Sequence, residues 1–303
     1  MAYSTKLFED SKYSNNRIIH EVTEFPGHMP LPCKYEHGHT PDDFASPRDL
    51  KTRKQLMLVY NKRRLNIWQN ASNIHAEIFG SPFVRYRHHK NIKQNADAKG
   101  TLCFPAHSGF KEQTEYSRED YCKELQQLDP KFHPITICLH EHDYDLGYAK
   151  VYEEYGFNIV CAGKRTEPDF VDKFYDILVD HKYATSNFFG SYIFYAVELG
   201  LHFFYFGDKP RLKDASNASQ DMLQPEESEF GALVYEAFDT YPNVETTDQQ
   251  RQIVADEVGL KDAIDNNALV KILRNYYPSQ KRIDCWNFIK RHPLKLFKLL
   301  FTK

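Results

Sequence analysis

The stretch KYATSNFFGSYIFYAVELGLHFFYF, residues 182–206, decides the fold. KYATS (182–186) is a short β-rich run, residues 188–199 have the apolar character of a buried helix that ends at Gly200, and LHFFYF (201–206) is a second β-rich run. A strand, a helix and another strand in this order are typical of a parallel crossover unit. The stretch therefore predicts two parallel strands with a helix packed on one face of their sheet.

The same alternation extends back to residue 102. Further strands are expected within 102–104, 134–140 and 157–163, and further helices within 117–128, 145–155 and 167–180. Ser117 is the expected N-cap of the first of these helices, with acidic residues in its first turn. Five strand candidates alternating with four helix candidates predict a parallel sheet that is covered on both faces.

A polar segment, KNIKQNADAKG (90–100), precedes this series and is typical of a linker. Before it the same pattern recurs in shorter form, with strands expected within 31–35, 55–60 and 74–80, and RIIHEV (17–22) as a further strand candidate. After residue 210, helical patterns take over at 226–239, 247–258, 261–275 and 283–300. The sequence thus predicts an N-terminal α/β domain over 1–98, a second α/β domain over 99–210 and a helical C-terminal extension over 211–303.

Composition narrows the classes of function. The 303 residues are 41% hydrophobic and 27% charged, which is enough to build a core, and their number suggests about two domains. The formal charge of −3 provides no global basic field, so no nucleic-acid partner is expected.

Several features indicate a cytoplasmic protein. No apolar run of about 18 residues predicts a membrane span, and the first 16 residues lack the apolar stretch of a signal peptide. The six cysteines contain no CxxC pair, and we interpret them as reduced thiols rather than zinc ligands or disulfides.

In open α/β sheets, ligands bind beyond the carboxyl ends of the strands. That rule selects four segments: EHGH (36–39), PAHSG (105–109), HEHDYD (140–145) and TSNFFGS (185–191). Three of them carry histidine where the expected strand ends. With 14 histidines in the chain, part of this clustering could arise by chance.

Two of these segments suit an anion. In TSNFFGS, Ser186 or Asn187 would cap a helix that begins at about residue 188, and the free N–H groups of that helix could hold a phosphate. The competing interpretation is an ordinary N-cap. In PAHSG, His107 and Ser108 could donate to an anion beside a tight turn, but the G-x-G-x-x-G spacing of dinucleotide sites is absent. The candidate residues for binding such an anionic ligand are His107, Ser108, Gly109, His140, Thr185, Ser186, Asn187, Gly190 and Ser191.

The other two segments suit acid–base chemistry or a metal. His37 lies at a strand end beside a glycine turn, as a general base could, and Glu36 could orient its ring. A histidine packed in a turn between domains is the alternative. In HEHDYD, His140 and His142 would face one side of an extended segment, but a solvated loop is the commoner explanation, and we expect no metal.

Together these residues carry a family resemblance. EHG at 36–38, the basic run LVYNKRR (58–64) and FGSPFVRYR at 79–87 resemble the second half of the N-terminal domain of GT-B glycosyltransferases. The segment 104–207 resembles the nucleotide-sugar-binding domain of that fold. It is most similar to bacterial surface-polysaccharide transferases, including the TSDYSS-type loop of the teichoic-acid CDP-glycerol transferases.

The resemblance implies a glycosyltransferase with two Rossmann-like domains, a nucleotide-sugar donor, a glycan or lipid-linked glycan acceptor and no cofactor. Carried onto this chain, His107, Ser108, Ser186 and Asn187 would contact the donor phosphates, and His37 would face the acceptor. This sequence has Asn187 where the TSD-type loop has Asp, and only 36 residues precede His37. We therefore expect either an abbreviated N-terminal domain or an acceptor site that has been lost or is shared. The E-x7-E pattern of many retaining members is absent from 188–199, which favours inversion.

Two alternatives to this enzyme stay open. A non-catalytic nucleotide-sugar or glycan-binding accessory protein of polysaccharide assembly would show the same loops, and a hydrolase would use the HEHDYD cluster with a metal. The C-terminal segment 285–303 combines aromatic and aliphatic residues with Lys and Arg and contains no acidic residue. It predicts peripheral contact with the inner face of a membrane. The alternative is a tail packed across the domain junction. The sequence leaves the oligomeric state open.

Overall fold

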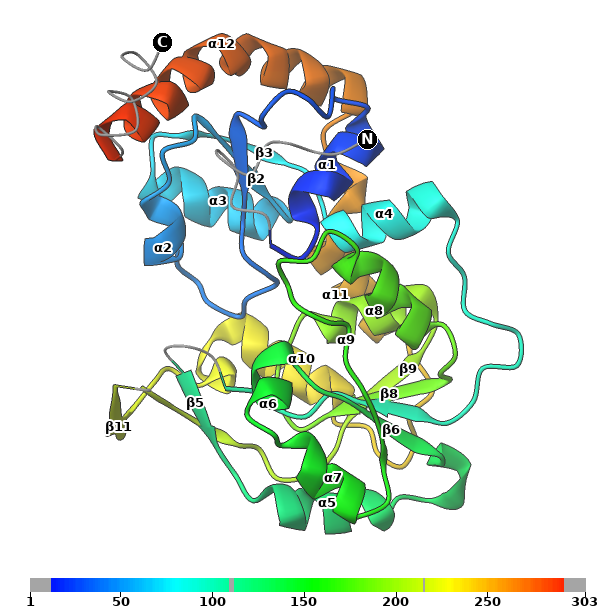
Figure 1. The fold of residues 1–303 in the computed structure, drawn as a ribbon. Coiled ribbons are helices and arrows are strands. Elements are labelled where there is room, and N and C mark those ends of the chain that lie inside the picture. Colours follow the sequence, from blue (N-terminus) through cyan, green and yellow to red (C-terminus); the bar gives the residue numbers. More distant parts are fainter. Residues whose placement is uncertain (1–11, 109–111, 215, 292–303) are drawn as a thin grey trace, which may run out of the picture.

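The computed structural model of the chain describes residues 12–108, 112–214 and 216–291. It is an α/β structure with two separate parallel sheets. Figure 1 shows the three-stranded sheet near the top of the molecule, beneath the last helix, and the five-stranded sheet below it. The parallel strands predicted from the sequence are all present.

The first sheet has the order β1-β2-β3, with β1 at Cys33–Tyr35, β2 at Leu56–Val59 and β3 at His75–Ile78. Three helices follow its strands in turn: α2 (Pro47–Leu50), α3 (Lys62–Ala71) and α4 (Pro82–Lys90). All four residues of β2 are buried. Alternate side chains of a strand point to opposite faces of the sheet, so both faces of this strand are covered. Leu56 and Leu58 join one core, while Met57 and Val59 join another together with Trp68 of α3.

The second sheet has the order β7-β6-β4-β8-β9, and every neighbouring pair is parallel. Its strands are β4 (Thr101–Cys103), β6 (Ile135–Cys138), β7 (Asn158–Val160), β8 (Tyr183–Ser186) and β9 (His202–Tyr205). The chain runs outward from β4 in one direction, then returns to place β8 on the other side of β4. The switch point of the sheet therefore lies between β4 and β8, at their carboxyl ends, where open α/β sheets bind ligands.

Helices cover both faces of this sheet, as the sequence predicts. On one face lie α5 (Arg118–Gln126) and α7 (Ala149–Glu154); the other carries α8 (Phe170–Leu178), α9 (Tyr192–Leu199) and α10 (Glu229–Phe238). The short helix α6 (Glu141–Asp145) follows the carboxyl end of β6. Ser117 caps α5 by accepting a hydrogen bond from Asp120 N–H at 3.1 Å, as expected. The core on the α8–α9 face also contains Phe83 of α4, so it continues across the predicted linker.

The N-terminal strand prediction is wrong. Residues 17–22 belong to a helix, α1 (Asn15–Thr23), whose Ile18, Ile19 and Val22 are buried. Their spacing of one and four positions places them on one face of a helix. This helix packs against α4 and against the last helix of the chain.

The C-terminal part is more than a helical extension. It begins with β10 (Arg211–Asp214) and β11 (Asn217–Asp221), which form an antiparallel sheet with β5 (Glu112–Glu115). The helices α10 and α11 (Asp248–Val258) then pack beside the five-stranded sheet, whereas α12 (Asn266–Arg291) returns to the first sheet. No helix among residues 12–291 is long and apolar enough to cross a bilayer.

Candidate functional site

The loops that follow β4 and β8 are joined at the switch point. The side chain of Asn187 accepts a hydrogen bond from Ala106 N–H at 3.0 Å and donates one to the carbonyl of Asp208, which follows β9, at 3.2 Å. Phe104 stacks on Tyr192 with ring centroids 4.5 Å apart. Asn187 is therefore a positioning residue that holds three loops together, and both its amide oxygen and its amide nitrogen are bonded within the protein.

The TSNFFGS segment differs from its predicted conformation. The helix begins at Tyr192 rather than at about residue 188, and its N-cap is Ser191, whose side chain makes no capping hydrogen bond. Ser186 turns back on the chain: its Oγ accepts from Phe188 N–H and lies 2.7 Å from the Tyr192 hydroxyl. The Thr185 hydroxyl donates to the carbonyl of Phe204 within the sheet. Both hydroxyls are buried and used internally.

Gly190 and Ser191 have packing roles of their own. A Cβ at Gly190 would lie 2.3 Å from the Tyr192 ring, so the glycine makes room for that ring rather than for a ligand. Ser191 Oγ accepts a hydrogen bond from His39 N–H at 3.0 Å. The EHGH segment thus rests on the start of α9, and two of the four predicted segments meet here.

Two histidines predicted for donor binding do come together. The rings of His107 and His140 stack with centroids 4.2 Å apart and an interplanar angle of 17°. Ser108, next in the loop, is tied to Thr114, whose N–H donates to Ser108 Oγ at 3.1 Å. Gly109 lies outside the described residues.

The His140 ring has a defined tautomer. Its Nδ1 accepts a hydrogen bond from His142 N–H at 3.2 Å, so the neutral ring carries its proton on Nε2 and can donate from there. Desolvation and the neighbouring positive charges of His107 and Arg165 lower the pKa of His140 to about 3. Desolvation, with His142 and Arg165, also lowers the pKa of His107, although the His107 side chain reaches solvent. Both rings are neutral at pH 7.

Arg165 is a site residue that the sequence analysis missed. It lies in the loop after β7, and its Nε is 3.1 Å from Glu141 Oε1. The carbonyl of Arg165 accepts a hydrogen bond from Tyr13 N–H at 2.6 Å, which ties the loop to the segment before α1. Its charge acts on His107, His140 and His37 alike. The signal that could have found it is the strand-end rule itself, because GKRTEP follows the strand predicted at 157–163.

His37 lies on the side of the first sheet that faces these loops. Its side chain is exposed, and its ring lies 5.7 Å from that of Tyr13. Desolvation by surrounding atoms and the positive charge of Arg48 lower its pKa, with smaller contributions from Lys12 and Arg165 and an opposing one from Asp49. A neutral imidazole that reaches solvent can accept a proton.

Glu36 does not orient His37 in the way that we expected. It is buried and accepts a hydrogen bond from Arg64 Nε at 2.6 Å on one carboxylate oxygen. The pKa of Glu36 is raised by burial, which outweighs the opposing effect of Arg64. The N–H of Glu36 donates to the carbonyl of Leu58 at 2.9 Å, so this residue extends the edge of the first sheet. The backbone N–H of His37 approaches Asp49 Oδ2 at 3.4 Å.

A buried polar network connects the first sheet to α11. His39 Nδ1 lies 3.0 Å from Glu257 Oε1, and Asn61 Nδ2 donates to Glu257 Oε2 at 2.9 Å. Arg63 is 3.4 Å from the same carboxylate. Burial lowers the pKa of His39 despite the carboxylate beside it. This network fixes how the EHGH segment is presented to α9.

The arrangement can therefore bind an anion with donors from three loops, and the first sheet can supply a base. The rings of His107 and His140 and the guanidinium of Arg165 provide the donors, and His37 provides the base. Among residues 12–108, 112–214 and 216–291, no three His, Cys, Asp or Glu side chains are grouped so as to hold a metal ion.

Comparisons with known proteins give limited resemblances. No protein-family model matches the chain, and no curated protein matches it. Two solved structures of a variant of the wall teichoic acid polymerase TagF are similar. The first, soaked with CDPG, is 14% identical to this chain with a TM-score of 0.41, and the match covers 77% of this chain and 58% of that structure. The second is 13% identical with a TM-score of 0.38, and the match covers 78% of this chain and 60% of that structure. The chain thus spans about three fifths of the length of the solved structures that it resembles.

Proposed function

We propose that this chain is a glycosyltransferase that moves a sugar from a nucleotide-sugar donor to a bacterial surface polysaccharide or its lipid-linked precursor. The proposed reaction is inverting and needs no resident metal. The six cysteines, none of which forms a disulfide, suit the reducing cytoplasm, where we propose that the reaction takes place.

One observation carries the proposal: His107, in the loop after β4 at the switch point, stacks on His140, which follows the neighbouring strand β6, and both rings lie within the electrostatic influence of Arg165, after β7. A nucleoside diphosphate is the ligand that suits this place, because it is an anion and open α/β sheets bind ligands at such switch points. Two neutral imidazoles can donate hydrogen bonds to phosphate oxygens, and the guanidinium can bind two of them at once. The hydrogen bonds of Asn187 fix the positions of the loops that follow β4, β8 and β9.

The chemical step needs a base on the acceptor side. An acceptor hydroxyl oxygen attacks the anomeric carbon of the donor, the bond from that carbon to the phosphate oxygen breaks, and the hydroxyl proton passes to His37. The nucleoside diphosphate leaves with the bonding electrons, and Arg165 stabilises the charge that develops on it. A single displacement of this kind inverts the anomeric centre.

The donor site is tested by measuring the dissociation constants of UDP, GDP and CDP for the full chain by calorimetry. Arg165→Gln and His140→Asn should each weaken the tightest of these complexes by a factor of about 10 to 150. That factor corresponds to the loss of a charge-assisted hydrogen bond of about 1.5–3 kcal/mol. Arg165→Lys should weaken the complex less than Arg165→Gln does, because lysine keeps the positive charge but lacks the planar guanidinium that binds two oxygens at once.

Arg251→Gln is the matched control, since Arg251 is an exposed arginine of α11 paired with Asp248. It should leave the dissociation constant unchanged. Thermal unfolding without nucleotide shows whether each variant is folded, because Arg165 is also paired with Glu141. Equal affinity in folded Arg165→Gln, His140→Asn and wild-type protein would place the donor elsewhere.

A further inference from the structure

The helix α12 has an inner face that holds it to the first sheet. Leu269 and Leu273 are fully buried in the core beneath it. Further along, Gln280 Oε1 accepts a hydrogen bond from Gln55 N–H at 3.0 Å, and Asp284 Oδ2 is 3.1 Å from Lys54 Nζ. These contacts fix the rotation of the helix about its axis as far as Asp284.

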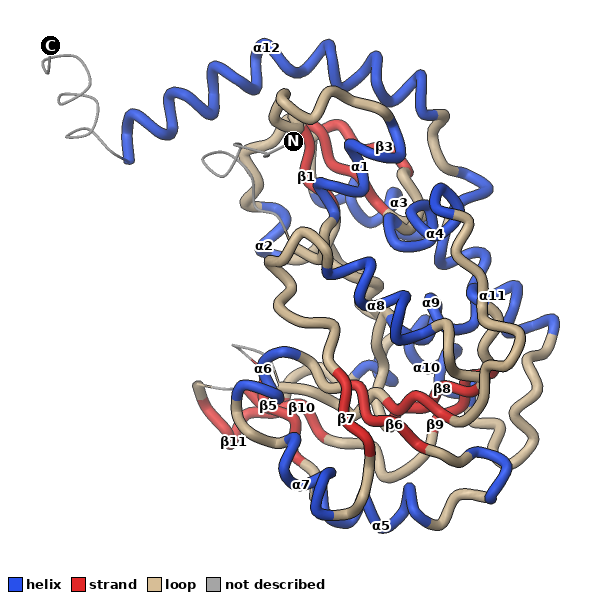
Figure 2. The backbone as a smooth tube through the Cα atoms, turned by 45° about the vertical axis from the view of Figure 1, so that its right-hand side comes forward, coloured by secondary structure: helices blue, strands red, loops and turns tan. Residues whose placement is uncertain are grey.

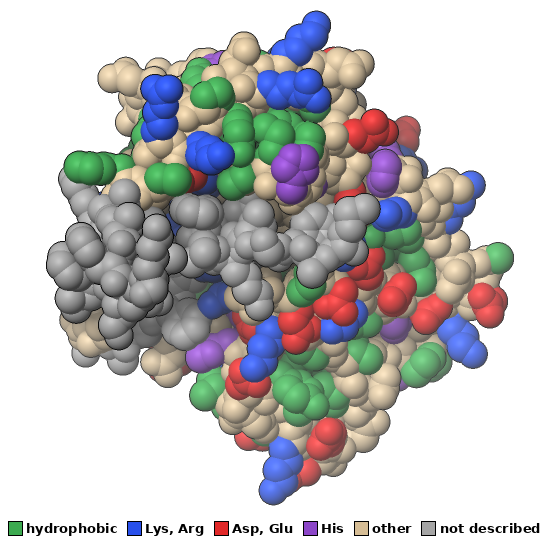
Figure 3. Space-filling view, turned by 45° about the horizontal axis from the view of Figure 1, so that its top comes forward, with side chains coloured by type: hydrophobic (Ala, Val, Ile, Leu, Met, Phe, Trp, Pro, Cys, Tyr) green, Lys and Arg blue, Asp and Glu red, His purple; other side chains and the backbone are tan. Residues whose placement is uncertain are grey.

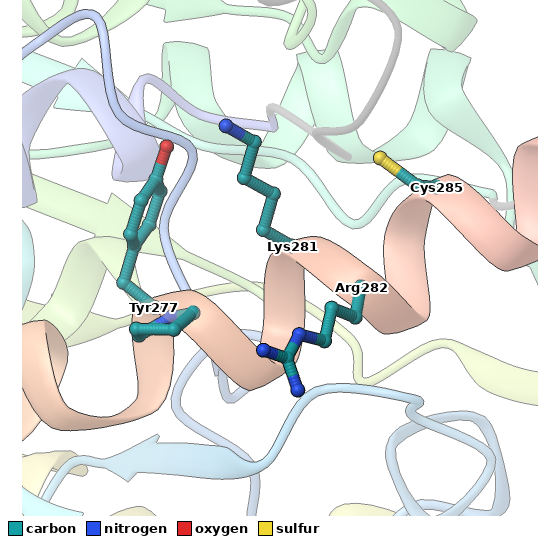
Figure 4. Close-up of a pocket in the computed structure, with 5 residues that line it drawn as sticks. Tyr277, Lys281, Arg282 and Cys285 are labelled. Atoms are coloured by element: carbon teal, nitrogen blue, oxygen red, sulfur yellow. The ribbon is translucent and has the colours of Figure 1, made fainter.

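Its outer face is basic and partly apolar. Pro278, Lys281, Arg282, Cys285 and Trp286 are exposed, and 58% of Trp286 is accessible to solvent. Figure 4 shows Tyr277, Lys281 and Cys285 projecting from one side of the helix and Arg282 from another, around a shallow hollow of about 420 Å³. The hollow is lined by α12 alone and lies apart from the loops of the candidate donor site.

The positive charge at this end of the chain is local. The whole chain has a formal charge of −3, yet no acidic residue follows Asp284 in the sequence, where Lys290, Arg291, Lys295, Lys298 and Lys303 occur. Figure 3 brings the top of the molecule forward and shows Lys and Arg side chains among hydrophobic ones on its upper part, while the acidic side chains gather mainly on the right and below. A surface that combines exposed Trp286 with exposed Lys281 and Arg282 complements a negatively charged lipid headgroup layer.

We infer that the outer face of the second half of α12 docks on a bilayer that contains anionic phospholipid. Trp286 enters the headgroup layer, and Lys281 and Arg282 on either side of the hollow bind lipid phosphates. Figure 2 shows α12 running over the first sheet and projecting past it at its C-terminal end, so a flat surface can reach this end. The inference stands on this surface and does not depend on the proposed transfer reaction.

The experiment is co-sedimentation of the full chain with phosphatidylcholine vesicles that contain or lack phosphatidylglycerol, at low and at high salt. Wild-type protein should bind only the anionic vesicles and should be released by salt. Each removed cation lowers binding to an anionic surface about fivefold, so Lys281→Glu with Arg282→Glu should lower it at least about 25-fold. Trp286→Ala should weaken binding without removing its salt dependence.

Lys123→Glu with Lys150→Glu is the matched control, because it reverses two exposed lysines on α5 and α7, at the opposite end of the molecule. This variant should bind anionic vesicles like the wild type. The inference is overturned if the two double variants bind equally, if neutral vesicles bind as well as anionic ones, or if no vesicle binds. A lipid-free dimer that only the α12 variant loses would assign this face to a second copy instead.

Discussion

At the scale of single residues, what decides a role is whether a polar side chain is already bonded inside the protein. Ser186 and Asn187 have the small polar side chains of a phosphate loop, but their partners are Tyr192, Ala106 and Asp208. Those partners come from distant parts of the chain, so sequence spacing alone could not reveal them. His37, by contrast, lies at its predicted strand end with its side chain exposed.

His37→Ala should lower turnover by a factor of about 10² to 10⁴, the usual effect of losing a general base. Because the pKa of His37 is lowered, the wild-type rate should fall on the acid side only below about pH 6.5, the ordinary value for histidine. Initial rates with donor and acceptor across pH measure both effects.

Donor affinity is the control for this variant, and it should change little, because the proposed reaction places His37 on the acceptor side. His89→Ala changes an exposed histidine of α4 and should leave the rate unaltered. Turnover within a few-fold of wild type in His37→Ala would rule out this base. If the wild type binds nucleotide without any turnover, the accessory-protein alternative is favoured.

At the scale of helices and strands, the sequence predicted the parallel strands well but missed the antiparallel strands β10 and β11. The parallel strands follow short β-rich runs, and strands such as β2 are buried on both faces. The hairpin β10–β11 lies in a polar stretch, RLKDASNASQD, without the alternation that identifies a strand. Its partner β5 is distant in sequence, and the pairing between them is therefore a tertiary effect.

The joining of the strand-end loops can be tested at Asn187. Asn187→Ala leaves Ala106 N–H and the Asp208 carbonyl without their partner, which should reduce the free energy of unfolding by about 1–3 kcal/mol. It should also weaken nucleotide binding, since the loop that carries His107 loses its tether. Urea denaturation and calorimetry measure the two effects.

Asn95→Ala is the matched control, because its amide donates to Asp180 at an exposed site. It should cost less than the change at Asn187, since water can replace the lost partner. Equal losses of stability in the two variants would contradict the positioning role of Asn187.

At the scale of the whole molecule, neutral histidines occur both in the loops after β4 and β6 and where the EHGH segment packs against α9 and α11. The pKa values of His39, His107 and His140 are all lowered by desolvation. In the unfolded chain a histidine titrates near pH 6.5, so below that pH the unfolded state binds more protons than the folded state. Stability is therefore fully present above about pH 6.5 and is lost as the pH falls towards the folded-state values.

The free energy of unfolding should thus decrease between pH 7 and pH 5. The slope from buried His39 is at most about 1.4 kcal/mol per pH unit, and exposed His107 contributes less. Denaturant unfolding at several pH values measures the slope. His140→Asn should make this slope shallower, whereas His89→Gln, at an exposed position, should leave it unchanged. If neither variant changes the slope, the pH dependence does not come from the histidines whose pKa is lowered.

The return of α12 to the first sheet has a consequence for the order of events during synthesis. The strands β1 to β3 leave the ribosome early, but the core on one of their faces includes Leu269 and Leu273. That face stays uncovered until residues 269–273 have been made. The five-stranded sheet draws all its strands from residues 101–205 and is complete earlier. The first sheet is therefore completed after the second, although its strands are translated before it, and its exposed leucines depend on the intervening residues folding promptly.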